Sequence, residues 1–452
     1  MHSLRRIVAI GAVLAIGLLA TSTSAQTNDK INAGIQFNFS SPGARSLAFG
    51  GAFVGLADDA TAAFTNPAGL TNLSLPEVAL EVRSWDYTTT FVDRGNASGQ
   101  ATGGGNCING VGDCISGVVL GETSKSTAGL SYISAVYPRG DWAVAVYRHE
   151  LARFRADFRD QGIFYDTGSV QTNPGRYFPL SAKMELDIVN YGVSAALRVS
   201  EKLSLGLGVS YYDLQLSSTT RRFNTSGPNP FGAGGRFGPP DYSDSNLRNL
   251  VAQRGDETAF GFNAGFLVKA TDALSIGGVF RQGPKLDYVS TANRVNPAGE
   301  SSIIETSLKV PNVVGLGLAY RLSDRATLSF DVDRVMYSQL TDNMQDAFEN
   351  PVIDVGSYAV DDANELHLGF EYVILTPKVI IPLRLGVWQD PDHKIRYEGQ
   401  FAEEKAYFRG GKNATHYTAG IGIVVGTPFE VNLAYDHSDP VKTVSVSAVV
   451  RF

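Results

Sequence analysis

The sequence predicts an all-β fold: a transmembrane antiparallel β-barrel of about 14 strands with an N-terminal hatch, or plug, inside its lumen. Three observations predict it. The chain begins with an export signal, apolar residues alternate with polar ones over most of its length, and tight connections alternate with long ones. Together they predict a multi-pass barrel in the outer membrane of a Gram-negative-type bacterium.

Residues 1–25 have the composition of a cleavable signal peptide. Arg5 and Arg6 precede an apolar run from Ile7 to Ala20, and small residues lead to Ala25. The run is shorter than the roughly 20 residues of a spanning helix, and such a run after a basic start is typical of a secretory signal. We therefore expect cleavage after Ala25; an uncleaved anchor is the alternative.

The composition suits many short strands. The chain has 48 Gly, 19 Tyr and 24 Phe but only 4 Met, and no other stretch is long and apolar enough for a membrane helix. The formal charge of −7 argues against a nucleic-acid partner, because nucleic-acid binding requires basic patches.

Alternation with a period of two is clearest at the C terminus. The apolar face of the last strand comprises Val444, Val446, Ala448, Val450 and Phe452. A final Phe in the apolar phase resembles the closing strand of a bacterial barrel, so we expect the barrel-assembly machinery to recognise Phe452. The same alternation recurs near 203–211, 260–268, 366–372 and 417–423.

Loop length separates the two ends of the predicted barrel. Tight turns lie at 138–141, 200–202, 271–273, 323–325 and 426–428. Longer polar connections lie at 93–125, 159–183, 218–257, 288–304, 341–361 and 390–412. Short periplasmic turns and long external loops are the plan of bacterial outer-membrane barrels. The fourteen expected strands begin near 76, 126, 141, 184, 203, 258, 273, 306, 326, 363, 380, 413, 429 and 442.

The expected wall occupies residues 75–452, which leaves residues 26–74 ahead of it. About eight strands already enclose a space that side chains can fill, so fourteen leave room in the lumen. The economical place for residues 26–74 is therefore inside the barrel, as a hatch. Within it, Asp58 or Asp59 can cap a short helix, and Asn66-Pro67 is a sequence typical of a turn.

No motif for catalysis was found. Metalloprotease, phosphate-loop and nucleophile-elbow patterns are absent, and the glycines of 420–426 follow the period of a wall strand rather than that of a dinucleotide loop. Cys107 and Cys114 lie in the first long loop, where an exported protein is expected to form a disulfide rather than a metal site. We expect no enzymatic activity, no metal and no cofactor.

Residues 43–70 resemble the hatch of the OmpP1/FadL/TodX family, outer-membrane transporters of hydrophobic compounds (long-chain fatty acid transporter-like). The resemblance rests on the stretch from Gly43 to Val54, on Ala57-Asp58-Asp59-Ala60 and on Asn66-Pro67-Ala68. Val310-Pro311-Asn312 and the tract from Asp331 to Gln339 are similar more loosely.

This resemblance implies passive uptake by a monomer whose partners are a hydrophobic small-molecule substrate and outer-membrane lipid. Long-chain fatty acids or aromatic hydrocarbons would be captured by external loops, held in a pocket beside the hatch, and released sideways at a kink in the third strand. The hatch residues expected to gate the pocket are Asn66, Pro67, Ala68, Arg45, Phe49 and Phe53. The same motifs also resemble the barrel component of the type IX secretion system, and the alternative is therefore a role in protein interaction.

Inward arginines are the expected ligands for a substrate carboxylate. The strand phase points Arg83, Arg281 and Arg384 into the lumen, where a desolvated guanidinium binds a carboxylate well. The alternative for each is a salt bridge to the hatch or to Glu81 and Glu371 of adjacent strands.

Alternation stops in the third strand. Trp142, Val144 and Val146 share the outward phase, but Tyr147, Arg148, His149 and Glu150 follow, and either phase then turns a charge toward lipid. Three interpretations remain. The strand leaves the membrane early, a bulge resets its phase, or the wall opens and these four residues line a lateral opening.

Overall fold

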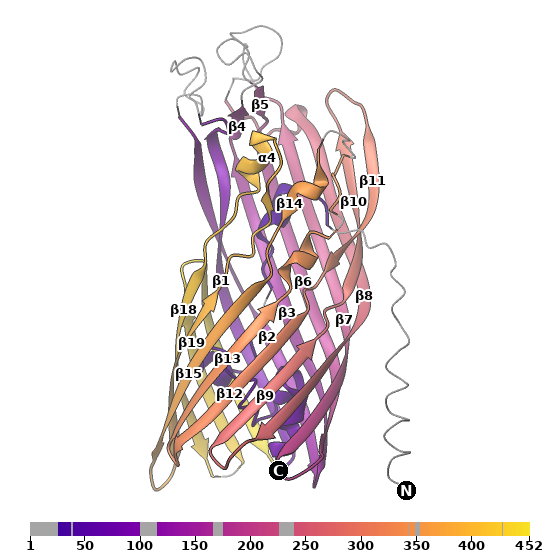
Figure 1. The fold of residues 1–452 in the computed structure, drawn as a ribbon. Helices are drawn as coiled ribbons and strands as arrows, with labels where there is room; N and C mark the ends of the chain where they lie inside the picture. Colours follow the sequence, from indigo (N-terminus) through magenta and orange to yellow (C-terminus); the bar gives the residue numbers. More distant parts are fainter. Residues whose placement is uncertain are drawn as a thin grey trace, which may run out of the picture.

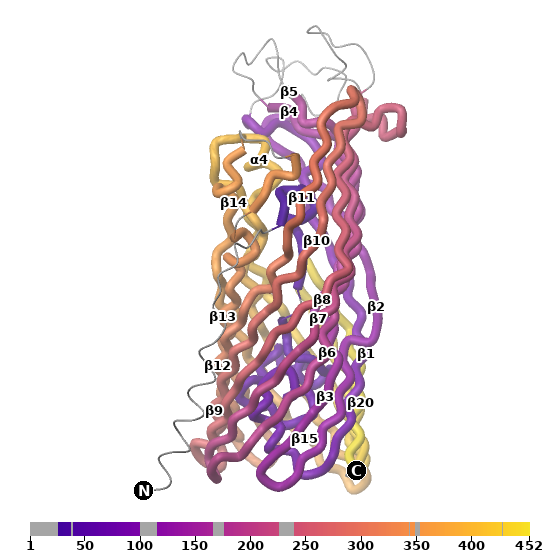
Figure 2. Tube along the Cα trace, turned by 90° about the vertical axis from the view of Figure 1, so that its right-hand side faces the viewer, coloured from indigo at the N-terminus to yellow at the C-terminus, as the bar shows by residue number. Residues whose placement is uncertain are grey.

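The computed structural model describes residues 26–37, 39–99, 115–165, 175–225, 239–342, 344–348, 353–426 and 428–452. They form a closed barrel of 14 antiparallel strands with the first segment of the chain inside it (Figures 1 and 2). The predicted fold class is confirmed. The expected signal peptide, Cys107 and Cys114 lie outside the described residues.

Twelve of the wall strands are continuous. They are β1 (Glu77–Asn96), β2 (Val118–Arg139), β3 (Trp142–Asp160), β6 (Leu180–Arg198), β7 (Leu203–Phe223), β8 (Leu247–Lys269), β13 (Ala326–Val335), β15 (Ala363–Leu375), β16 (Ile380–Asp390), β18 (Ala414–Val425), β19 (Phe429–His437) and β20 (Val441–Arg451). The other two are interrupted and consist of β9 (Leu274–Arg281) with β10 (Lys285–Arg294), and β11 (Ser301–Lys309) with β12 (Val313–Ser323).

The first and last strands close the barrel. β1 pairs with β20 in an antiparallel ladder from Glu77 opposite Arg451 to Tyr87 opposite Val441. The C terminus lies at the end of the barrel that carries the short turns, at the bottom of Figure 1. We call this the short-turn end and the opposite one the long-loop end.

Small elements gather at the long-loop end. They are β4 (Gly162–Tyr165), β5 (Gly175–Tyr177), η4 (Asp244–Asn246), η5 (Tyr337–Leu340), η6 (Val355–Ser357), β14 (Tyr358–Ala359), β17 (Arg396–Tyr397) and α4 (Ala402–Tyr407). Among the described residues, no helix has the length and apolar character needed to cross a membrane.

The strands reach further toward the long-loop end than the sequence predicted. β2 begins at Val118 rather than near 126, β8 begins at Leu247 rather than near 258, and β10 and β11 occupy much of the expected loop 288–304. These extensions were missed because their outward positions are polar, so that they lack the apolar alternation used to find strands.

The outward face of the lower wall is an apolar band. On β7 it comprises Leu205, Leu207, Val209 and Tyr211, which are exposed on the barrel surface. Their neighbours Ser204 and Ser210 face inward and are buried. This outward-apolar pattern is that of a strand in contact with lipid.

Above the band the same strands reverse their pattern. On β7 the outward positions become Asp213 and Gln215, while the inward positions become Leu214 and Leu216, both buried. β6 repeats this change, with Met184 and Leu186 inward. The barrel therefore has an apolar lumen at the level where its outer surface is polar.

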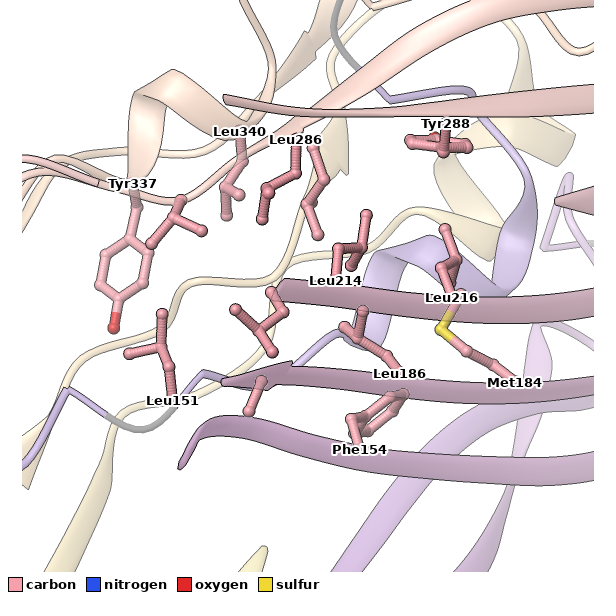
Figure 3. Close-up of a cluster of buried hydrophobic side chains, with 14 of the residues drawn as sticks. Leu151, Phe154, Met184, Leu186, Leu214, Leu216, Leu286, Tyr288, Tyr337 and Leu340 are labelled. Carbon is pink, nitrogen blue, oxygen red and sulfur yellow. The ribbon is translucent and has the colours of Figure 1, made fainter. Parts of the chain in front are cut away.

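These inward residues form one buried group, which we call the upper lumen cluster (Figure 3). Its labelled members are Leu151, Phe154, Met184, Leu186, Leu214, Leu216, Leu286, Tyr288, Tyr337 and Leu340. Residues 26–39, which we call the N-terminal arm, run through the same space, with Ile31 and Phe39 buried in the cluster. The arm contains the short helix η1 (Lys30–Gly34).

The rest of the hatch, residues 40–74, fills the lumen near the short-turn end. It contains α2 (Ala44–Ala48), α3 (Ala62–Thr65) and η2 (Pro67–Asn72). The wall approaches it through inward glycines, where any side chain would collide with hatch backbone. A Cβ on Gly206 would lie 2.3 Å from the Ala68 nitrogen, and one on Gly386 would lie 2.3 Å from the Gly50 nitrogen. Gly265, Gly277, Gly317, Gly369 and Gly420 make similarly close contacts with the hatch.

Candidate functional site

The Asn66-Pro67-Ala68 motif anchors the hatch to the wall. Asn66 is fully buried, and its side-chain amide donates hydrogen bonds of 3.0 Å to the carbonyl oxygens of Val54 and Phe266. Its side-chain oxygen accepts from the Ala68 nitrogen at 3.2 Å and so caps η2, in which Pro67 is the first residue. A proline fits there because the first helical position needs no N–H donor.

Arg45 joins the hatch to an ionic network on the inner face of the barrel wall. It lies 2.6 Å from Asp58, 3.3 Å from Asp59 and 3.7 Å from Glu371 of β15. Glu371 in turn pairs with Arg384 of β16 at 2.7 Å. The predicted gating residue is thus held by hatch and wall carboxylates at once.

The two phenylalanines predicted to gate the pocket are completely buried in the hatch. Phe53 lies under the Arg45 guanidinium, 5.4 Å from it. Phe49 packs against β15, where a Cβ on Gly369 would lie 2.3 Å from the Phe49 oxygen. Both residues therefore contribute to the position of the hatch, and neither is among the residues that line the cavity beside Arg281.

Arg83 and Arg384 are each paired with a glutamate of the wall. Arg83 lies 2.6 Å from Glu81, whose other oxygen accepts from the Gly43 nitrogen of the hatch at 2.9 Å. Arg384 contacts Glu371 and also donates to Asn432 at 2.6 Å. These are the salt bridges considered as the alternative to substrate binding, because a guanidinium already paired in this way has little capacity left for a ligand.

Arg281 differs from the other two. It pairs with Asp333 at 3.3 Å, and its guanidinium lies over the ring of Phe64, 5.2 Å from the ring centre. Its Nε and Nη1 atoms are buried and have no hydrogen-bond partner among the described residues. Unpaired buried donors are costly, so these two N–H groups are suited to donate hydrogen bonds to an oxygen atom of a ligand.

A narrow cavity lies beside Arg281, between the hatch and the wall. Its lining residues are Phe39, Phe64, Tyr147, Leu151, Ser210, Tyr212, Phe262, Asn263, Arg281, Gln282, Gly283, Val310, Pro311 and Val313. The cavity volume is about 20 Å³, which is about the space of a single water molecule. A larger ligand therefore requires hatch or arm side chains to move.

The third strand contains a bulge, leaves the apolar band early and is only partly paired with β2. Its ladder with β6 shifts register between Glu150 and Ala152, which is a bulge. Beyond the bulge the outward positions are polar, beginning with Arg153, so the strand has left the apolar band. Its ladder with β2 ends at Tyr132 opposite His149, and above that point the two strands are not paired.

The four residues predicted for a lateral opening lie where this ladder ends. His149 packs on Phe64 of the hatch with ring centres 4.2 Å apart, and the Tyr147 hydroxyl lies 2.8 Å from that of Ser210. Arg148 donates to the Leu130 carbonyl of β2, and Glu150 pairs with Arg148 and Arg153 of β3 itself. Tyr147 and His149 thus face the hatch, and Arg148 connects the edge of β3 to β2.

Side chains span the unpaired stretch between β2 and β3. Arg153 donates to the Ala128 carbonyl at 2.7 Å, and Thr123 donates to the Asp157 carbonyl at 3.0 Å. The outer surface there is polar, because the stretch lies above the apolar band.

The N-terminal arm is tied to the long-loop end, which sequence reasoning did not foresee. Lys30 forms a buried salt bridge with Glu404 of α4, and Glu404 also accepts hydrogen bonds from Tyr177 at 2.9 Å and Tyr358 at 2.7 Å. Burial raises the pKa of Glu404, but Lys30 and the hydrogen bonds outweigh it and the pKa is lowered. Glu404 therefore remains an anion that holds the arm.

The upper lumen cluster was also missed, although the sequence carries a signal for it. In β6 and β7 the apolar residues change from the outward to the inward phase within a single strand. Such a reversal could have been found by following the phase beyond the membrane segment.

Comparisons with known proteins agree with this architecture. Residues 20–391 match the family described as outer membrane protein transport protein (OMPP1/FadL/TodX). No curated protein sequence matches the chain.

Three similar solved structures share the fold over nearly the whole chain. A FadL homologue from Pseudomonas aeruginosa has 14% sequence identity and a TM-score of 0.60, with 93% of this chain and 99% of that one covered. The Ralstonia pickettii toluene transporter TbuX has 16% identity and a TM-score of 0.54, with 92% and 98% covered. The Pseudomonas putida toluene transporter TodX has 15% identity and a TM-score of 0.51, with 92% and 98% covered.

None of these comparisons supports the alternative of a type IX secretion barrel. The family match covers most of the chain and agrees with the closed barrel, so the protein is placed in the outer membrane. The chain belongs to the OMPP1/FadL/TodX family of outer-membrane transport proteins.

Proposed function

We propose that this protein is a passive channel for hydrophobic molecules, of which long-chain fatty acids and aromatic hydrocarbons are the leading classes. The observation that carries the proposal is the upper lumen cluster. Leu186, Leu214 and Leu216 face the lumen. In a water-filled porin, by contrast, the side chains that line the lumen are polar. A hydrocarbon solute enters an apolar lumen without a desolvation penalty, whereas ions and sugars would lose their hydration and are excluded.

The similar structures support the same class of substrate. Two of them are described as toluene transporters, from Ralstonia pickettii and Pseudomonas putida. At their low identity they do not select among substrates, and an apolar pocket discriminates mainly by size.

In the proposed path, the substrate enters at the long-loop end and displaces the N-terminal arm. Ile31 and Phe39 of the arm occupy the cluster, and their apolar contacts can be exchanged for those of a substrate. The substrate then reaches the cavity beside Phe64 and Arg281. Because this cavity is too small for an acyl chain or an aromatic ring, the hatch must move to widen it.

We further propose that release is lateral rather than through the hatch. The hatch packs closely against glycines of seven of the fourteen wall strands, so release toward the short-turn end would require the hatch to be displaced. Tyr147, Arg148, His149 and Glu150, at the end of the β2–β3 ladder, are the residues expected from the family resemblance to border a lateral opening.

A pair of matched variants tests the lumen. Leu214→Gln places an amide among the inward leucines, whereas Gln215→Leu changes the outward neighbour on the same strand. We expect Leu214→Gln to reduce uptake of radiolabelled oleate and toluene by proteoliposomes, and Gln215→Leu to leave it unchanged. Heat-modifiable gel migration reports folding of both. Normal uptake by a folded Leu214→Gln barrel would contradict the proposal, as would mass spectrometry that finds only polar molecules co-purifying in mild detergent.

A further inference from the structure

The ammonium group of Lys30 lies among aromatic side chains at the long-loop end. Its Nζ atom is 4.7 Å from the ring centre of Phe408 and 5.6 Å from the ring centres of Tyr177 and Tyr407. The face of an aromatic ring attracts a cation over distances of about 6 Å. The Lys30 side chain is only 9% exposed, so the rings have replaced most of its water. We call Tyr177, Tyr407, Phe408 and Glu404 the ammonium cage.

Glu404 supplies the negative charge of the cage. It forms the salt bridge with Lys30 and accepts hydrogen bonds from the hydroxyl groups of Tyr177 and Tyr358. Lys30 is its only ion-pair partner in the described part of the chain. If Lys30 leaves, a buried carboxylate therefore remains without a cation, which is strongly unfavourable. The cage requires a cation to replace the one that departs.

A second cation nearby has a different anion. Arg222 lies over the rings of Tyr177 and Tyr407, 4.6 Å and 5.6 Å from their centres. It is attracted to the carboxylate of Asp160, which accepts a hydrogen bond from the Tyr407 hydroxyl at 3.2 Å. Among the described residues Arg222 forms no ion pair with Glu404, so it does not take the place of Lys30.

The cage borders the upper lumen cluster. Tyr407 packs against the cluster, and the arm continues from Lys30 directly into it. The apolar side chains of the arm that lie in the cluster or pack against it are those of Ile31, Ile35, Phe37 and Phe39. The arm thus places a cationic group in the cage and apolar groups along the lumen, in the order of the head and tail of an amphiphile.

The charges of the cage distinguish between head groups. The faces of its rings carry partial negative charge, and Glu404 carries a full one. A carboxylate in the cage would be repelled by both, and an uncharged head would leave Glu404 unpaired. An organic ammonium group satisfies both, and aromatic cages of this kind are the usual means of recognising quaternary ammonium ligands.

We propose that the ammonium cage is a binding site for the cationic head group of an amphiphile, such as an alkylammonium or alkyltrimethylammonium compound, whose chain follows the upper lumen cluster. Lys30 occupies this site as an internal substitute for the ligand. The site rests on the proposed function only in requiring that the arm can leave the lumen. It adds a preference among head groups, which an apolar lumen alone does not provide.

Removal of the internal substitute tests the cage directly. Lys30→Ala empties the cage, and tetramethylammonium, which has no chain, probes it by titration calorimetry in an uncharged detergent. We expect Lys30→Ala to bind this ion at least about tenfold more tightly than the wild type, in which Lys30 competes. Adding Glu404→Gln to Lys30→Ala should abolish most of the gain. Lys405→Ala, which removes an exposed lysine of α4 outside the cage, should behave as the wild type.

Heat-modifiable gel migration reports folding of each variant. A folded Lys30→Ala barrel that binds tetramethylammonium no better than the wild type would overturn the proposal. The same holds if the double variant retains the full gain, since the binding would then lie outside the cage.

A second measurement uses the wild-type chain and two amphiphiles of equal chain length. We expect decyltrimethylammonium to bind at least about tenfold more tightly than decanoate. In Glu404→Gln the two dissociation constants should become nearly equal. Their ratio is informative because a merely loosened arm competes less with both compounds alike. Equal affinities in the wild type, or a ratio unchanged in Glu404→Gln, would overturn the site.

Failure of the proposed function gives a different result. The wild-type protein would then not carry oleate or toluene into proteoliposomes, whereas tetramethylammonium would still bind to Lys30→Ala in detergent. Normal uptake without any preference for the ammonium head would overturn the cage alone.

Discussion

The side-chain amide of Asn66 in the hatch donates a 3.0 Å hydrogen bond to the carbonyl oxygen of Phe266 in β8. This bond joins the hatch to β8, whose ladder with β9 ends at Asn263 opposite Arg281. A displacement of the hatch is therefore transmitted to the wall beside the cavity.

The first prediction concerns this anchor. Replacing Asn66-Pro67-Ala68 with three glycines, or Asn66 alone with Ala, leaves the Val54 and Phe266 carbonyls without their donor. A lost buried hydrogen bond costs about 1–3 kcal/mol. This loss destabilises the docked position of the hatch and leaves the hydrogen bonds between wall strands intact. We expect normal heat-modifiable migration with reduced uptake of oleate. Wild-type uptake at equal abundance would remove the anchor from the mechanism.

The second prediction separates substrate classes at Arg281. In Arg281→Met combined with Asp333→Asn, both partners of the salt bridge are neutral, so no buried charge is left unpaired. Loss of a charge-assisted bond should weaken oleate binding by about tenfold, while toluene, which has no carboxylate, should bind as before. Titration calorimetry in detergent measures both, with Asp333→Asn as the control that keeps the arginine. An equal loss for the two compounds would refute a carboxylate role for Arg281.

The third prediction concerns pH and the N-terminal arm. His393, in the loop after β16, stacks on Tyr337 with ring centres 4.7 Å apart and contacts Gln36 of the arm at 3.1 Å. Burial lowers the pKa of His393, but Asp390 and the Pro391 carbonyl outweigh it and raise the pKa to about 9. Because the pKa of His393 is raised on folding, its protonated form stabilises the folded state. This contribution is complete below the ordinary pKa of about 6.5 and is lost as pH rises through 9.

We therefore expect the arm to become more accessible to protease between pH 8 and 10, by the linkage just given. His393→Phe keeps the stack on Tyr337 and lacks the titrating group, so its arm should show no such change in that range. A pH dependence that is the same in His393→Phe would assign the effect to another group.

The fourth prediction concerns Cys107 and Cys114 in the first long loop. Closing the short loop between them costs little chain entropy, and the compartment is oxidising. We expect an intramolecular disulfide, seen as a mass deficit of about two hydrogens without reductant. Two alkylatable thiols in protein purified without reductant would contradict it.

The fifth prediction concerns topology. Epitope tags near residues 105, 230 and 400 should be accessible to antibody on intact cells, because they lie in the long connections. A tag at Asp324, in the turn between β12 and β13, should not be. Surface labelling at Asp324 would reverse the orientation of the barrel.

The sequence alone determined the strand count, the orientation of most side chains and the presence of the hatch. Period-two alternation is a local property of each strand, so Trp142, Val144 and Val146 could be placed outward without knowledge of their neighbours. The inward glycines, such as Gly420, likewise indicate positions at which another segment packs closely against the strand.

Only the tertiary structure decided how inward groups are paired. Arg83, Arg281 and Arg384 share the same phase in the sequence, yet Arg83 pairs within its own strand, and Arg281 and Arg384 pair with carboxylates of other strands. Arg281 has two buried donors, Nε and Nη1, without a hydrogen-bond partner among the described residues. The end of the ladder between β8 and β9 also depends on register across strands, which alternation does not encode. Pairing and register arise from contacts between residues far apart in the chain, and these exist only once the barrel has closed.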